Sequence, residues 1–276
     1  MGTPFISILE PSKLDDYDRR KPHDQQAPSV PRTFIDAMEV RESVFVKEQG
    51  VPIDYEHDSD DSRSVHWVVY ASVRQVVEQE LTDPATGQII RPRRSETRTQ
   101  PIGTVRLVPF PHPPHPVPGG KYVDNVLQNQ EVNTLTASQE ERRTSALPYG
   151  RDAPTNLHDG KEAFIKVGRL SVIKEFRGYK AAGLLWSAAR EWMVNHPHYF
   201  NPSVTELGLD ALKAQGVNDI PRWKGLVCVH AQEDVKGLWE KWGFQVDEAM
   251  GKWWEEGIPH IGMFQRLQPV DVPIRF

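Results

Sequence analysis

The sequence predicts an α/β (α+β) fold in which helices flank a sheet. Residues 164–172 alternate apolar and polar side chains, as a strand does, and a short turn leads from them into an apolar helical pattern at 184–193. Residues 64–77 and 102–108 show two further strand patterns. Residues 225–242 show a strand followed by helical spacing. Strands and helices that alternate along one chain of 276 residues indicate a layered fold.

The first elements follow from short patterns near the N-terminus. The apolar run Phe5–Leu9 predicts a strand, and a helix is expected from Thr33 until Gly50-Val51-Pro52 ends it. The acidic segment DYEHDSDD (54–61) comes next. Two interpretations of it stay open: a solvated loop, or a negative surface that attracts a cationic amine substrate.

Three polar or proline-rich stretches are expected to interrupt a single domain of residues 1–276. They lie near 78–100, 109–160 and 197–224. The first is predicted to be a long polar hairpin with a solvated basic cluster, and short helices are expected near 137–143 and 205–215. Six of the ten residues from Pro109 to Pro118 are proline, which predicts an extended connector.

Composition narrows the partners and the chemistry. The net charge of −5 and the pI near 6.1 give no reason to expect nucleic-acid binding. His112 and His115 have no Cys or carboxylate at ligand spacing, so no metal site is predicted. Cys228 is the only cysteine and lies between Val227 and Val229, which predicts a buried strand thiol. No secretory signal and no membrane-spanning run is visible, so a cytoplasmic or nucleocytoplasmic location without a membrane partner is expected.

The stretch from 164 to 184 also predicts an anion site. The turn carries Arg177 and Gly178 and leads directly into a helix, whose first N–H groups have no partner within the helix. A Walker loop would need Gly-Lys-Ser/Thr at the helix start, but Leu184 follows Gly183. A dinucleotide fingerprint would need a second Gly where Lys180 stands.

The turn resembles motif A of the GNAT acetyltransferases, Gln/Arg-x-x-Gly-x-Gly/Ala. Arg177 fills the first place and Ala182 the last, but Lys180 stands where the family has Gly. Residues 41–71, with Val-Phe-x-x-Glu-Gln, and residues 230–263, with Lys-x-Gly-Phe and Gly-Ile-Pro-His, are similar to one GNAT subgroup. The resemblance implies the GNAT acyl-CoA N-acyltransferase fold, a mixed, mostly antiparallel splayed sheet flanked by helices. It also implies transfer of acetyl from acetyl-CoA to a primary amine, in a small molecule or a peptide, by direct attack through a tetrahedral intermediate.

The same resemblance implies where the co-substrate binds. Leu170 and Val172 would offer backbone groups to the acetyl and pantetheine amides. Gln232 stands where many members have an Asn near the cofactor. Trp239 stands where the family has a Tyr that acts as general acid, and an indole is no practical acid. The pyrophosphate would be held by the turn and the helix start, that is by Arg177, Gly178, Tyr179, Lys180, Ala181, Ala182 and Gly183.

Three residues are candidates for the base that takes the proton of the amine. His230 is favoured because it ends the strand next to the thioester, and His260 lies in the Gly-Ile-Pro-His turn. Glu48 is the third. Each has a structural alternative: a core histidine, a turn residue that bonds locally, and a brace for the first helix. Because of Trp239, a non-catalytic acyl-CoA-binding domain that acts as a sensor or partner module stays open. The oligomeric state also stays open.

Overall fold

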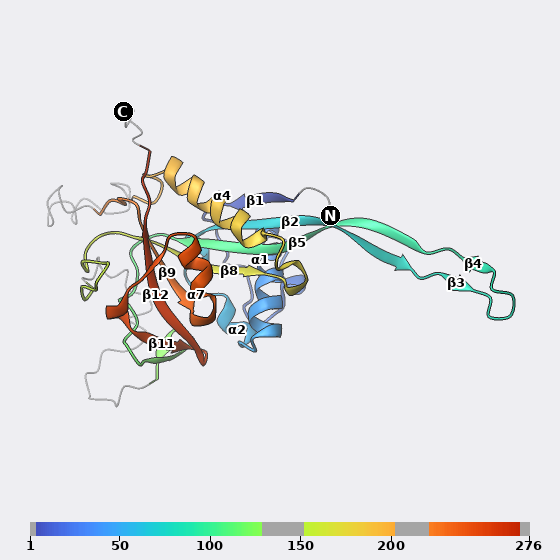
Figure 1. Ribbon diagram of the computed structural model, residues 1–276, viewed down its shortest axis with the longest axis horizontal. Coiled ribbons are helices and arrows are strands. Elements are labelled where there is room, and N and C mark those ends of the chain that lie inside the picture. The colour runs from blue at the N-terminus through green and yellow to red at the C-terminus, as the bar shows by residue number, and fades with distance from the viewer. Residues whose placement is uncertain (1–3, 129–151, 202–220, 271–276) are drawn as a thin grey trace. The chain divides into compact units, whose positions relative to one another are not determined.

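The computed structural model describes residues 4–128, 152–201 and 221–270, which form two compact units. Unit 1 comprises Met1–Arg106 and Arg169–Ala189, and unit 2 comprises Leu107–Gly168 and Arg190–Phe276. Both units combine strands with helices (Figure 1), so the α/β class is confirmed. The helices expected near 137–143 and 205–215 lie outside the described residues.

Unit 1 starts with the elements that the sequence predicts. β1 (Phe5–Leu9) pairs antiparallel with β2 (Val65–Glu78), and β2 neighbours β5 (Arg94–Val108). The expected helix is α1 (Arg32–Arg41) continued by a π-helical segment, Glu42–Glu48. The helix packs on the sheet because Ala37 contacts Val68 and Tyr70. Its other apolar side chains form a core with the N-terminal loop: Leu14, Tyr17, Val30, Phe34, Ile35 and Met38.

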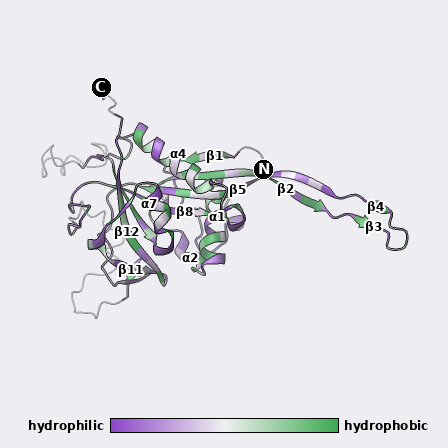
Figure 2. Cartoon of the chain, viewed as in Figure 1, coloured by the Kyte–Doolittle hydropathy of each residue, from purple (hydrophilic) through white to green (hydrophobic). Residues whose placement is uncertain are grey.

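A long hairpin confirms the excursion expected at 78–100. β2 and β5 continue beyond the core of unit 1, and β3 (Leu81–Thr82) and β4 (Ile89–Arg91) close the end of the hairpin (Figure 1). The turn at its tip forms around Asp83, whose side chain accepts the N–H groups of Ala85 and Thr86. The hairpin carries both hydrophilic and hydrophobic residues (Figure 2), and its end is solvent-exposed.

In unit 2, β12 (Ile258–Arg266) is the central strand. It pairs antiparallel with β9 (Leu226–Gln232) on one side and with β11 (Lys252–Glu255) on the other. β6 (Lys121–Val123) and β7 (Val126–Leu127) continue the order beyond β11, and β10 (Gln245–Val246) pairs with β12. A short helix, α7 (Lys236–Lys241), follows β9. The core of this unit contains Phe164, Leu226, Cys228, Met250, Trp253 and Phe264.

The last two strands of unit 2 form a hairpin. Residues 244–251 contain only β10 and a 3₁₀ turn, Glu248–Met250, and the final hairpin is β11–β12. Its turn needs Glu256 and Gly257, which both have positive φ, at 50° and 78°. The remaining 3₁₀ turns are His23–Gln25, Asp61–Arg63, Lys174–Phe176 and Glu233–Val235. A four-residue helix, α2 (Ile53–Glu56), completes the helices and strands of the described residues.

β8 (Ile165–Val172) and α4 (Ala181–Asn195) confirm the predicted strand, turn and helix. β8 pairs in parallel with β9 over Ile165↔Val227, Lys166↔Cys228 and Val167↔Val229. This pairing ends at Val167 and Val229, although β9 continues to Gln232. On α4, Leu185, Ala189 and Met193 are buried, whereas Leu184 is 40% exposed. None of the helices in the described ranges is long and apolar enough to cross a membrane.

Candidate active site

The turn between β8 and α4 in unit 1 has the backbone geometry of an anion site. Gly178 and Lys180 both adopt left-handed conformations, with φ of 85° and 64°. The first helical hydrogen bond runs from the Leu184 N–H to the Lys180 carbonyl, at 3.0 Å. The N–H groups that precede it, up to Gly183, therefore have no acceptor within the helix. A Cβ added at Gly178 or Gly183 would meet no atom within 4 Å, so the space beside both is open.

The Arg177 side chain forms hydrogen bonds with two groups of the protein. Its two terminal nitrogens donate to the two Glu48 carboxylate oxygens at 2.6 and 2.7 Å, and its Nε donates to the Val172 carbonyl at 2.9 Å. Arg177 thus ties the turn to the end of the π-helical segment. The ion pair positions the turn, and the expected role of Arg177 as a pyrophosphate ligand stays a prediction. The expected contact of Val172 backbone groups with the co-substrate also stays a prediction.

The same pair argues against Glu48 as the base. The hydrogen bond from Arg177 lowers the pKa of the Glu48 carboxyl, and both carboxylate oxygens are already acceptors. A carboxylate stabilised in this way is a weaker proton acceptor. The structure therefore favours the alternative that Glu48 braces the first helix.

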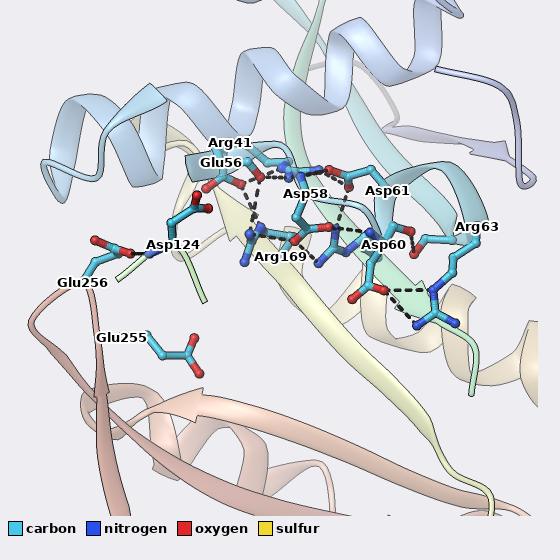
Figure 3. A network of polar contacts seen from close by, with 12 residues as sticks. Arg41, Glu56, Asp58, Asp60, Asp61, Arg63, Asp124, Arg169, Glu255 and Glu256 are labelled. Atoms are coloured by element: carbon cyan, nitrogen blue, oxygen red, sulfur yellow. Dashed lines mark hydrogen bonds and ion pairs between the residues drawn. The ribbon is translucent and has the colours of Figure 1, made fainter. Parts of the chain in front are cut away.

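The acidic segment forms a buried ion network, so both interpretations of it were wrong (Figure 3). Arg41 is fully buried and donates to Glu56 and Asp61, each at 2.7 Å. Three carboxylates and three guanidinium groups alternate in this network: Glu56, Asp58 and Asp61 with Arg41, Arg106 and Arg169. The charges balance inside unit 1, so these carboxylates offer no free negative surface to an amine.

The network also holds a distorted position of β8. Arg169 has a φ of 51°, which is unusual for a residue with a side chain. Its guanidinium contacts Glu56 at 2.9 Å and Asp58 at 3.1 Å. Burial raises the pKa of the Asp58 carboxyl, but Arg106 more than compensates and lowers it to about 2. Ionised carboxylates thus anchor the point where β8 departs from regular strand geometry.

In unit 2, Glu255 lies between the two candidate histidines. His230 Nδ1 lies 3.8 Å from one Glu255 oxygen, and His260 Nε2 lies 3.9 Å from the other. The Trp253 indole N–H donates to Glu255 at 2.8 Å. His260 Nδ1–H donates to the Ile258 carbonyl at 2.9 Å, which leaves the lone pair on Nε2. The sequence placed His230 and His260 apart, and the β9–β12–β11 order brings them together.

The environment of His230 favours the alternative of a core histidine over the role of base. Burial lowers the pKa of His230 to about 3, and nearby Lys166 acts in the same direction. The imidazole is therefore neutral near pH 7 and accepts a proton only weakly. His260, whose Nε2 faces the Glu255 carboxylate, stays a candidate base.

Three further residues are expected to contact the co-substrate: Leu170, Gln232 and Trp239. Leu170 lies in β8 of unit 1, and Gln232 is the last residue of β9 in unit 2. Trp239 is buried in unit 2, with edge-to-face contacts to Trp242 and Phe244 at centroid distances of 5.2 and 5.0 Å. This packing favours a core role for Trp239, and contact with the co-substrate stays a prediction.

Two groups of possible metal ligands come together that the sequence does not reveal. In the described part of the chain, His115, Cys228 and His230 form one group with possible ligand atoms within 4.8 Å of one another, and His115, Asp152 and His158 form a second. The sequence shows no such group because its members come from separate segments. No short spacing in the sequence could have identified them.

Comparisons with known proteins give structures but no family model. No family model matches the chain, and no curated protein does. Among solved structures, a proposed N-acetyltransferase from Lactobacillus plantarum is 17% identical with a TM-score of 0.45, over 96% of this chain and 99% of that one. Escherichia coli ElaA is 15% identical with a TM-score of 0.42, over 96% and 100%. An acyl-CoA N-acyltransferase from Pseudomonas aeruginosa is 14% identical with a TM-score of 0.40, over 95% and 99%.

At TM-scores below 0.5 these similarities carry no argument, and the GNAT assignment stays a prediction. The fold class does not depend on them. The parallel β8–β9 pair and the antiparallel strands beyond β9 form the mixed, mostly antiparallel sheet that the resemblance implied.

Proposed function

We propose that this protein is an acyl-CoA-dependent N-acyltransferase that transfers acetyl from acetyl-CoA to a primary amine. The observation that carries the proposal is the turn at Gly178–Lys180, whose two left-handed residues lead into the unpaired N–H groups of α4. Such groups and the helix dipole favour a phosphate group. The pyrophosphate of CoA supplies that charge.

The end of β9 supports binding of the pantetheine arm. From His230 to Gln232, β9 pairs with β12 along one edge, whereas the recorded pairing with β8 stops at Val229. Backbone groups at a strand edge suit an extended chain with amides of its own.

The reaction proposed is attack of the neutral amine nitrogen on the thioester carbon. The C–N bond forms, the carbonyl oxygen becomes an oxyanion, and collapse of the intermediate breaks the C–S bond. The amine proton passes to a base, for which His260 is our candidate, and the CoA thiolate takes a proton from solvent. A backbone N–H that donates to the oxyanion would lower the barrier by about 3 kcal/mol.

Calorimetry of CoA binding tests the proposal in the Gly183→Asp variant. The added side chain has open space, and an acidic residue in the first turn stabilises a helix, so the variant is expected to fold. The carboxylate repels the pyrophosphate, and the dissociation constant of CoA is expected to rise by about 10-fold or more. Ser187→Asp places the same charge on an exposed position of α4 and Gly183→Ala adds only the Cβ. Equal affinity in all three variants would sink the proposal.

A second function is favoured by Trp239 and His230. Trp239 replaces the family's acid and is packed in the core, and burial keeps His230 neutral, as expected for a domain that binds acyl-CoA without transfer. Free CoA release separates the two functions. The amines to test are polyamines, amino sugars, arylamines and Lys peptides. If the protein binds acetyl-CoA but none of these amines leads to CoA release, the binding domain is favoured.

A further inference from the structure

A group of three possible metal ligands lies in unit 2, away from any short sequence motif. His115 comes from the proline-rich connector, and Cys228 and His230 are alternate residues of β9. Alternate residues of a strand point to the same face. Possible ligand atoms of all three lie within 4.8 Å of one another.

A chain of hydrogen bonds determines which nitrogen of His115 is free. His158 Nε2 lies 2.9 Å from the Glu162 carbonyl, which can only accept, so Nε2 carries the proton of a neutral His158. His158 Nδ1 is then an acceptor, and His115 Nε2, 3.1 Å away, donates to it. The lone pair of His115 therefore lies on Nδ1.

His230 is oriented in a similar way by Glu255. Its Nδ1 faces the Glu255 carboxylate at 3.8 Å, which favours the proton on Nδ1 and the lone pair on Nε2. Nε2 is buried and has no hydrogen-bond partner among the described residues. An unpaired buried acceptor is costly unless a ligand satisfies it. A carboxylate that orients a histidine from behind is a common arrangement at metal sites.

Cys228 completes the group with a soft donor. It is fully buried and forms no disulfide, and burial raises the pKa of the thiol to about 12. A bound metal deprotonates a coordinating thiol, because the ion's charge outweighs the burial. The other charges that act on this thiol are those of Lys166, Asp152 and Asp247, one positive and two negative.

We propose that His115, Cys228 and His230 bind a zinc-class divalent ion through two imidazole nitrogens and one thiolate. This donor set suits Zn²⁺, which prefers nitrogen and sulfur ligands. The other two members of the second group, Asp152 and His158, position His115 and are not proposed as ligands. Both nitrogens of His158 are engaged, and the Asp152 carboxylate accepts the backbone N–H groups of His115 and Ala153 at 2.7 and 2.8 Å.

Co²⁺ is the probe, because a thiolate bound to Co²⁺ gives a charge-transfer band and Cys228 is the only cysteine in the chain. The full chain, stripped of metal with a chelator, is titrated with Co²⁺ and then with Zn²⁺. We expect the band to saturate at one equivalent and to disappear as Zn²⁺ displaces Co²⁺. Cys228→Ser is expected to lose the band, and His230→Gln to weaken binding by about 10-fold or more. His196→Gln alters an exposed histidine of the same unit and should bind as the natural chain does.

Thermal unfolding keeps the test decisive where a variant is unstable. Zn²⁺ is expected to raise the Tm of the natural chain and of His196→Gln, because a ligand of the folded state stabilises it. It should not raise the Tm of Cys228→Ser, and it should raise the Tm of His230→Gln by less than that of the natural chain. The proposal is overturned if the natural chain gives no thiolate band at one equivalent of Co²⁺. It is also overturned if a folded Cys228→Ser or His230→Gln binds Zn²⁺ as tightly as the natural chain.

Discussion

Arg41 is completely buried, and the free energy of its burial depends on two carboxylates that face it. Glu56 and Asp61 are also buried, at 3% and 1% exposure. Removal of one partner from such a network leaves an uncompensated charge in the interior, which costs more than the pair itself contributes. At the scale of single residues, the stability of unit 1 therefore depends on these ion pairs staying complete.

The Arg41→Met variant should therefore lower the free energy of unfolding by about 3–5 kcal/mol. Methionine keeps much of the side-chain volume, so the loss comes from the unpaired carboxylates. Arg63→Ala is the matched control, because the Arg63–Asp60 pair at 2.8 Å is partly exposed and should contribute less than about 1 kcal/mol. Urea unfolding of both variants measures the difference. Similar losses in the two would show that the buried network is no more important than a surface pair.

Sequence separation explains why residues 54–61 were misinterpreted. The partners of this segment are 15, 48 and 111 positions away in the contacts Arg41–Glu56, Arg106–Asp58 and Arg169–Asp58. Local charge density is visible in a sequence, but the guanidinium groups that neutralise it are brought in only by the fold. The same holds for His115, which only the fold brings close to Cys228 and His230. By contrast, the burial of Cys228 was predictable from its two Val neighbours.

At the scale of elements, the strand, turn and helix at 165–195 were predictable because their signals are local. Period-two alternation, Gly178 and the apolar spacing of the helix all lie within a few residues of one another. The conformation of Lys180 was not predicted from its own type, since a left-handed φ is uncommon for Lys. The family motif has Gly at this place, the residue that a left-handed conformation favours.

Lys180→Gly should therefore stabilise the protein. A left-handed conformation costs a residue with a Cβ roughly 1–2 kcal/mol, and the added flexibility of glycine offsets part of that gain, so we expect about 0.5–1 kcal/mol. Tyr179→Gly, at the neighbouring exposed position that has no positive φ, should instead destabilise by about 0.5–1 kcal/mol. Denaturant unfolding of the two variants gives the signs. A loss of stability in both would contradict the strain assigned to Lys180.

At the scale of the whole molecule, the proposed reaction depends on which group takes the amine proton. The sequence favoured His230 by position alone, and position was insufficient because burial decides the basicity of an imidazole. With its pKa lowered to about 3, His230 does not change its charge between about pH 6 and 9. Glu48 is likewise ionised over that range, since Arg177 lowers the pKa of its carboxyl.

The rate of transfer should consequently follow the ionisation of the amine. Below the pKa of the amine, kcat/KM is expected to rise about 10-fold per pH unit, because only the neutral amine attacks. Ethylamine and 2,2-difluoroethylamine differ little in size, and fluorine lowers the pKa of the second. The inflection of the pH profile should move to lower pH with the fluorinated amine. An inflection at the same pH for both amines would instead identify a group of the enzyme, and its loss in His260→Gln but not in His230→Gln would assign it to His260.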